Sequence, residues 1–213
     1  MHRHRGLEVP STLVEACRPD RTALVLYDLQ AGILRQIADG ERVLARAVAL
    51  VQAAREAKVR VLFVRHVTLP VELMGVSQMR MWMAWQGASK PEEVVSPFPP
   101  HAPESQIVAE VAPGPGEAVL DKLTMSAFEG TPLTFVLRDC GVTTVVLGGV
   151  ALEIGIEPTA RHAADLGFIP VIATDACGAG NAEAGHRTLE ALSFSGDAMQ
   201  CEVDELREIW ASG

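Results

Sequence analysis

The stretch of residues 143–168 constrains the fold most, because it places a buried strand, a tight turn and a helix in quick succession. Residues 143–147 (TTVVL) are β-branched or apolar without alternation. This pattern is typical of a strand that is covered on both faces in a parallel sheet. Gly148 and Gly149 follow, and we expect them to end the strand.

Beyond this turn, apolar residues recur at helical spacing as far as Gly167, which is expected to end the helix. Pro158 then has to lie in the first helical turn, where its missing N–H costs nothing. Residues 153–156 would form the entrance of the helix, with free backbone N–H groups and the positive end of the dipole. We therefore expect the working site at this turn, with room for a ligand anion.

Strand-like and helix-like patterns alternate along the rest of the chain, which predicts an α/β fold with a mostly parallel sheet and helices on both faces. Residues 68–101 break the pattern and are expected to form an inserted loop or a helical flap, and residues 105–111 one helical turn or two. The other expected strands are 22–27, 60–64, 117–120, 169–174 and 199–203, and the other expected helices are 13–17, 38–57, 131–139, 182–192 and 204–210.

Length and composition predict one soluble domain. The 213 residues suffice for a single core, so we expect residues 1–20 to form an N-terminal arm and residues 21–213 one domain. The chain has no apolar run of the ~20 residues that span a bilayer and no secretory signal, so a cytoplasmic location without a membrane partner is expected. The net charge of −9 argues against a nucleic-acid partner. Four cysteines without metal-type spacing predict free thiols.

Polar residues follow two of the expected strands. Asp28 comes directly after residues 22–27, and Lys122 lies at the end of the expected strand 117–120. In parallel sheets, ligands bind outside the carboxyl ends of the strands, so Asp28, Lys122 and the glycine-rich turn should converge on one pocket. Each residue also has a structural interpretation, since Asp28 could cap a helix and Lys122 could be a solvated charge.

Four segments together carry a resemblance to a known family. They are YDLQ at 27–30, DKLTMSAFEGTPL at 121–133, VVLGGVALEIGIEPTARHAADLGF at 145–168 and TDACGAG at 174–180. In this order and spacing the chain resembles the isochorismatase-like hydrolase superfamily. The resemblance implies a three-layer αβα sandwich with a six-stranded sheet. It also implies a non-proline cis peptide near Val150 and Ala151.

The resemblance also implies catalytic roles. Many members are amidohydrolases with an Asp, Lys and Cys triad; here Asp28 matches the acid/base, Lys122 its partner, and the nucleophile falls on Gly155. Glycine offers no nucleophile. The family branch that similarly has Gly is the isochorismatase proper, which cleaves a vinyl ether without a covalent intermediate. A protonated Asp28 would then protonate the terminal carbon of the enol ether of a small anionic metabolite.

The protonation state of Asp28 is open at this point. The ammonium of Lys122 would lower the pKa of Asp28, whereas burial would raise it. Lys122 could instead pair with a substrate carboxylate, which would leave Asp28 freer to hold its proton. Two alternatives also remain. Cys177 could serve as a relocated nucleophile of an amidohydrolase, or the chain could be a catalytically silent family member that binds a metabolite or a partner protein.

Neither a cofactor nor a metal is expected, because His66 stands alone after its strand and His101 lies far off in the sequence. A lone histidine is more often a structural hydrogen-bond partner.

Expected substrate contacts come from the resemblance and from the turn. The residues expected to contact a small-molecule substrate are Gln30, Gln78, Arg80, Trp85, Phe128, Val150 and Ala151.

Residues 73–85 bring methionines and tryptophans close together, and this apolar surface would be hard for a monomer to hide. The resemblance also implies dimers or larger assemblies. We therefore expect a homodimer or a higher homo-oligomer.

Overall fold

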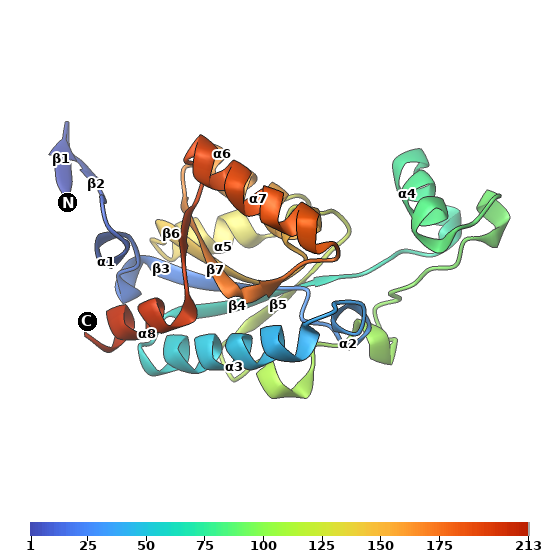
Figure 1. Cartoon of the computed structure of the whole chain (residues 1–213), viewed down its shortest axis with the longest axis horizontal. Coiled ribbons are helices and arrows are strands. Elements are labelled where there is room, and N and C mark those ends of the chain that lie inside the picture. The colour runs from blue at the N-terminus through green and yellow to red at the C-terminus, as the bar shows by residue number, and fades with distance from the viewer. Residues whose placement is uncertain (213) are drawn as a thin grey trace.

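The computed structural model describes residues 1–212, which form one central six-stranded sheet with helices on both sides (Figure 1). The strand order is β5-β4-β3-β6-β7-β8, and every neighbouring pair is parallel, as the alternation predicted. The strands are β3 (Thr22–Tyr27), β4 (Arg60–His66), β5 (Ala118–Lys122), β6 (Thr144–Val150), β7 (Ile169–Gly178) and β8 (Met199–Cys201).

The helices make two covering layers, which confirms the expected three-layer sandwich. On one face lie α3 (Gly40–Glu56) and α8 (Val203–Ala211); on the other lie α5 (Leu133–Asp139), α6 (Glu157–Asp165) and α7 (Ala182–Ser195) (Figure 1). Successive side chains of a strand point to opposite faces. In β3, Leu24 and Leu26 therefore join the core under α3, whereas Val25 and Tyr27 join the core under α5 and α6.

The glycines of β6 do not end the strand, contrary to expectation. β6 continues through Gly148 and Gly149 to Val150, and its pairing with β7 shifts register between Leu147 and Gly149. Gly149 has φ +130, and a Cβ there would overlap the carbonyl of Tyr27. These glycines allow two strands to approach closely rather than break one of them.

The segment after β6 forms a single π-helical turn, Leu152–Ile156, before α6 begins at Glu157. Pro158 lies in the first turn of α6, as predicted. Gly167, with φ +88, follows the end of this helix. β7 is longer than expected, so Asp175 lies inside the strand and forms an ion pair with Arg46 of α3.

The N-terminal arm is partly regular. Two exposed three-residue strands, β1 (His2–His4) and β2 (Leu7–Val9), form an antiparallel hairpin in the arm, where no strand was expected. Strands this short carry too little periodicity to be recognised. The expected helix at 13–17 is confirmed as α1 (Leu13–Ala16), and a further short helix, α2 (Ala31–Leu34), was not expected.

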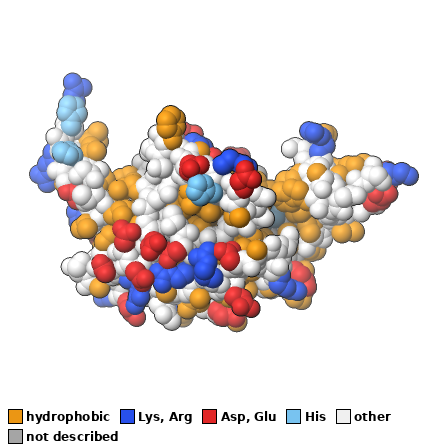
Figure 2. Space-filling model, viewed as in Figure 1, with side chains coloured by type: hydrophobic (Ala, Val, Ile, Leu, Met, Phe, Trp, Pro, Cys, Tyr) orange, Lys and Arg blue, Asp and Glu red, His pale blue; other side chains and the backbone are white. Residues whose placement is uncertain are grey.

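Residues 68–101, which we call the flap, stand away from the sheet and carry the helix α4 (Val76–Gln86) (Figure 1). Trp82, Val94 and Phe98 form a small core of their own inside the flap. Figure 2 shows hydrophobic side chains gathered between the flap and the rest of the molecule. Among residues 1–212, no helix is both long and apolar enough to cross a membrane.

Candidate active site

A buried ion pair lies at the carboxyl edge of the sheet. Lys122, the last residue of β5, donates a hydrogen bond from Nζ to Oδ2 of Asp28, which follows β3, over 2.8 Å. The two side chains reach each other across the end of β4, the strand between them. Lys122 is 1% exposed and Asp28 6%. The sequence prediction that these residues converge is consistent with this geometry.

Burial dominates the electrostatics of the pair. It raises the pKa of Asp28, although the charge and hydrogen bond of Lys122 act in the opposite direction. Burial likewise lowers the pKa of Lys122 against the pull of Asp28. The second carboxylate oxygen, Oδ1 of Asp28, is buried and has no hydrogen-bond partner. Asp28 can therefore hold a proton to higher pH than an ordinary carboxyl group.

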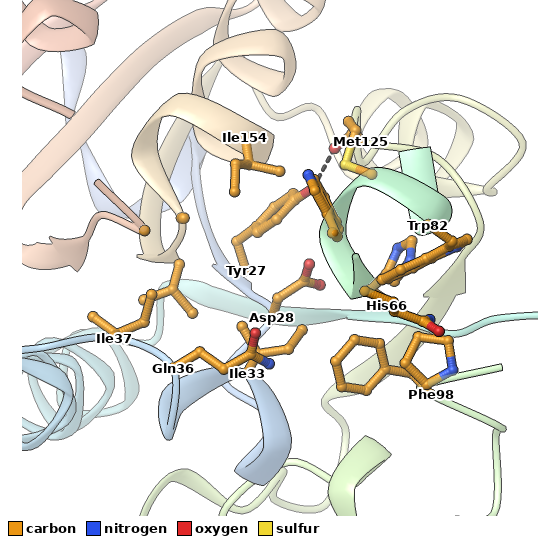
Figure 3. A pocket seen from close by; sticks show the side chains of 16 residues that line it. Tyr27, Asp28, Ile33, Gln36, Ile37, His66, Trp82, Phe98, Met125 and Ile154 are labelled. Atoms are coloured by element: carbon orange, nitrogen blue, oxygen red, sulfur yellow. Dashed lines mark hydrogen bonds between the residues drawn. The ribbon is translucent and has the colours of Figure 1, made fainter. Parts of the chain in front are cut away.

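A cavity of about 400 Å³ opens beside this pair (Figure 3). The flap contributes an aromatic wall of Trp82, Trp85 and Phe98. Four polar side chains also line the cavity, namely Asp28, Gln36, His66 and Gln86. The rest of the lining is mostly aliphatic and consists of Tyr27, Ile33, Ile37, Pro97, Met125, Val150, Ala151, Ile154 and Gly180. A volume of this size suits a small molecule.

The turn after β6 forms one edge of the cavity. The peptide bond between Val150 and Ala151 is cis, as the resemblance implies. The carbonyl of Ala151 accepts the backbone N–H groups of Ile154 (3.3 Å), Gly155 (3.0 Å) and Ile156 (3.1 Å). The expectation of free N–H groups at this helix entrance is therefore wrong for residues 154–156. The π-helical turn bonds these three donors to one carbonyl, so they are not available to hold an anion.

Gly155 lies against the ring of Tyr27. A Cβ at position 155 would overlap Cε1, Cζ and the hydroxyl of Tyr27. Tyr27 is 1% exposed, and its hydroxyl donates to the carbonyl of Met125. The space that a side chain at position 155 would need is thus occupied by an anchored ring. Sequence reasoning missed Tyr27; the available signal was an aromatic residue at the end of an otherwise aliphatic strand.

His66, the last residue of β4, is a second missed residue. Its side chain lies beside Trp82 and Phe98, with ring centroids 6.1 Å and 6.2 Å away, and it lines the cavity. Both ring nitrogens are buried without a hydrogen-bond partner. The interpretation as a structural hydrogen-bond partner was therefore wrong. Burial and the nearby charge of Lys122 lower the pKa of His66 to about 3, so the ring is neutral at physiological pH.

Three of the expected substrate contacts, Trp85, Val150 and Ala151, line the cavity. Gln30 lies outside the lining. Its side chain is buried and connects two segments of backbone, since it accepts from the N–H of His66 and donates to the carbonyls of His66 and Ser105.

The other expected contacts also lie outside the lining. Gln78 donates to the carbonyl of Leu123 over 3.2 Å, and Phe128 stacks on Phe168 with ring centroids 5.8 Å apart. Arg80 is exposed on α4. It is two positions before Trp82, so the two side chains leave the helix on nearly opposite sides.

The thiols lie apart from the cavity. Cys177 is 3% exposed, outside the lining, and burial raises its pKa to about 12. Cys140, at the end of α5, is the exposed cysteine. Among residues 1–212, no group of three or more His, Cys, Asp or Glu side chains is placed to hold a metal ion.

Comparisons with known proteins agree with this architecture. The isochorismatase domain model matches residues 22–201. The chain is 38% identical over 165 residues to the uncharacterized isochorismatase family protein YecD of Escherichia coli, which covers 76% of this chain and 82% of that protein.

Solved structures show the same fold. A cysteine hydrolase from Pseudomonas syringae has a TM-score of 0.79 at 22% identity, over 91% of this chain and 94% of that one. An isochorismatase family protein from Burkholderia thailandensis has a TM-score of 0.74 at 28% identity, over 90% and 96%. With its sheet order, its Asp28–Lys122 pair and these matches, the chain belongs to the isochorismatase family of hydrolases.

Proposed function

We propose that this protein is a cofactor-free hydrolase in which Asp28 acts as the acid and no covalent intermediate forms. The observation that carries the proposal is the Asp28 carboxyl group itself. It lines the cavity, burial raises its pKa, and Oδ1 is left without a partner while Oδ2 accepts from Lys122. A proton on Oδ1 would therefore face the substrate.

Vinyl-ether hydrolysis is the reaction that this arrangement serves. The proton on Oδ1 of Asp28 moves to the terminal carbon of the enol ether, and the carbon that bears oxygen becomes an oxocarbenium ion. Water then adds to that carbon, its surplus proton returns to the carboxylate, and the resulting hemiketal collapses to a carbonyl compound and an alcohol. The ammonium of Lys122, 2.8 Å from Oδ2, stabilises the carboxylate between the two proton transfers.

Amide hydrolysis by a relocated thiol has less support. Its nucleophile would be Cys177, whose pKa of about 12 leaves almost no thiolate at neutral pH and whose side chain lies outside the cavity lining. A catalytically silent binding protein would share the fold but has no need for a buried ion pair, which is costly to keep.

Turnover of simple enol ethers tests the proposal. Phenyl vinyl ether would give phenol and acetaldehyde, and isochorismate would give pyruvate; a coupled dehydrogenase detects either carbonyl product. We expect turnover of at least one of these compounds by the wild-type protein and loss of it in Asp28→Asn, which keeps the shape of the side chain but has no acidic proton. Absence of turnover with every enol ether would favour the silent binding protein.

We also propose that the protein self-associates through the flap and resides in the cytoplasm. Large apolar side chains of the flap are exposed to solvent, namely Leu73 (65%), Val76 (81%), Trp85 (51%) and Val95 (65%). Exposed apolar surface of this kind is typical of an interface. All four cysteines are free, in keeping with a reducing compartment.

A further inference from the structure

The lining of the cavity offers no cationic side chain to bind an anionic ligand. No lysine or arginine occurs among the residues that line it within the described chain 1–212. The nearest ammonium, that of Lys122, is already bonded to Asp28. The backbone N–H groups of Ile154, Gly155 and Ile156 are bonded to the carbonyl of Ala151. A carboxylate or phosphate placed here would lose its hydration without gaining an ion pair with a lining side chain.

The cavity also lacks a free counter-charge for a cationic ligand. Asp28 is the carboxylate in the lining, and the ammonium of Lys122 lies 2.8 Å from it. The same ammonium lowers the pKa of His66, so the positive charge of Lys122 is felt at the polar end of the cavity. A second cation would be repelled there.

Buried hydrogen-bonding atoms without a partner, by contrast, are present. Oδ1 of Asp28 and both ring nitrogens of His66 are buried and have no partner. A neutral imidazole offers one donor and one acceptor. Buried polar groups of native proteins are nearly always bonded, so these atoms point to a ligand that supplies the missing bonds.

The remaining walls define the shape of that ligand. Trp82, Trp85 and Phe98 line the cavity together with the branched side chains of Ile33, Ile37 and Ile154. Trp82 and Trp85 meet edge to face, with centroids 5.1 Å apart. Aromatic and branched aliphatic walls favour a flat apolar body.

From these features we propose that the cavity binds an uncharged, ring-containing molecule whose polar group bonds to His66 and to Asp28. The inference rests on the proposed function in that it names the substrate class of the same site. His66 is then a positioning residue that fixes the polar group of the substrate next to the acid. The anionic metabolite that the family resemblance implies is replaced by a neutral one.

Three ring compounds of one shape test the charge preference: benzamide (neutral), benzoate (anionic) and benzamidinium (cationic), titrated into the wild-type protein by calorimetry at pH 7.5. We expect benzamide to bind about tenfold more tightly than either ion. Equal or tighter binding of benzoate or benzamidinium, or binding of none of the three at millimolar concentration, would overturn the proposal.

The role of His66 is tested by substitution. His66→Phe should weaken benzamide about tenfold, which is the effect of losing one hydrogen bond, and should leave benzoate unchanged. His66→Gln, which keeps a donor and an acceptor, should recover part of the affinity. The control is His186→Gln on the exposed face of α7, which should change nothing. Unchanged benzamide affinity in His66→Phe would contradict the positioning role.

Turnover separates this inference from the proposed function. Phenyl vinyl ether and its carboxylated analogue 4-vinyloxybenzoate share the reacting group and differ in charge. A preference for benzamide without turnover of either ether would leave the inference standing and remove the proposed function. Preferred turnover of 4-vinyloxybenzoate would support the proposed function and overturn the inference that the substrate is uncharged.

Discussion

The ring of Tyr27 lies where a side chain at position 155 would have to begin. A Cβ on Gly155 would overlap the ring, and the ring cannot move aside freely because it is 1% exposed and its hydroxyl donates to the carbonyl of Met125. The absence of a nucleophile at position 155 is therefore built into the packing of two elements, β3 and the π-helical turn. A single substitution would not restore it.

Adding a side chain at position 155 should destabilise the protein. Gly155→Ala is expected to lower the free energy of unfolding by about 1–3 kcal/mol, because the new methyl group overpacks a filled site. The measurement is urea unfolding, with Gly75→Ala as the control, since nothing lies within 4 Å of a Cβ there. In the double variant Tyr27→Ala/Gly155→Ala the clash is gone, so the two losses should be less than additive. Additive losses would show that the ring and position 155 do not compete for space.

Removing one member of the buried ion pair should cost more than removing both. Lys122→Met leaves the Asp28 carboxylate buried without a counter-charge, at a cost of about 3–5 kcal/mol near neutral pH. Because its pKa then rises further, the carboxyl group is neutral at low pH, and the cost should shrink as pH falls. Asp28→Asn/Lys122→Met should be more stable than Lys122→Met alone at pH 7.5. Chemical denaturation across pH measures both effects, and a pH-independent cost would argue against a buried charge.

His66 should make stability depend on pH. Its folded-state pKa of about 3 lies below the ordinary value of 6.5. Between these values the unfolded chain binds a proton that the folded chain does not, so the stability present above pH 6.5 is lost as pH falls toward 3, by about 1 kcal/mol per pH unit. The charge of Lys122 also acts on His66, and it remains in a His66→Phe variant. The difference in unfolding free energy between wild type and His66→Phe should therefore change with pH in this window; a constant difference would mean that the ring is not desolvated.

The cysteines should differ sharply in reactivity. Cys140 is exposed, whereas Cys17, Cys177 and Cys201 are buried. Iodoacetamide should therefore modify one cysteine in the native protein and four after unfolding, as counted by mass spectrometry. Turnover of the natively alkylated protein should be intact, because no thiol attacks the substrate. Loss of turnover that follows modification of Cys177 would restore the amidohydrolase interpretation.

The exposed flap should drive self-association. We expect sedimentation velocity to show a dimer or larger species at micromolar concentration. Val76→Glu and Trp85→Glu together should shift the protein toward the monomer, because they place charge in an apolar contact. Val14→Glu, an equally exposed apolar position on α1 (61%), is the matched control. A wild-type monomer would contradict the proposal.

Much of the fold could be predicted because its signals are local and periodic. The unbroken apolar run at Thr22–Tyr27 matched its strand at both ends, and Pro158 marked the first turn of α6. The end of β6 was mispredicted because glycine is common both at the ends of strands and where two backbones approach each other closely. Here the backbone of Tyr27 lies next to Gly149, so the glycine permits close approach, and the sequence alone does not show this contact.

The candidate site was predictable only in part. Asp28 and Lys122 could be predicted because each lies at the end of an expected strand, and the parallel sheet brings these ends together. The role of His66 depends on what surrounds it, namely Trp82 and Phe98 from a flap whose path no periodicity encodes. The hydrogen bonds that occupy the donors of the helix entrance depend on a π-helical turn, which differs from an α-helix by one residue of register and leaves no compositional trace.

Acid catalysis by Asp28 is tested most directly by comparing the turnover of Asp28→Asn with that of Cys177→Ala on the same enol ether. We expect Asp28→Asn to lose at least about a hundredfold in kcat, as expected for removal of an acid catalyst, while Cys177→Ala stays within a few-fold of the wild type. Both variants should keep the wild-type circular dichroism spectrum. An inactive Cys177→Ala beside an active Asp28→Asn would contradict acid catalysis without a covalent intermediate.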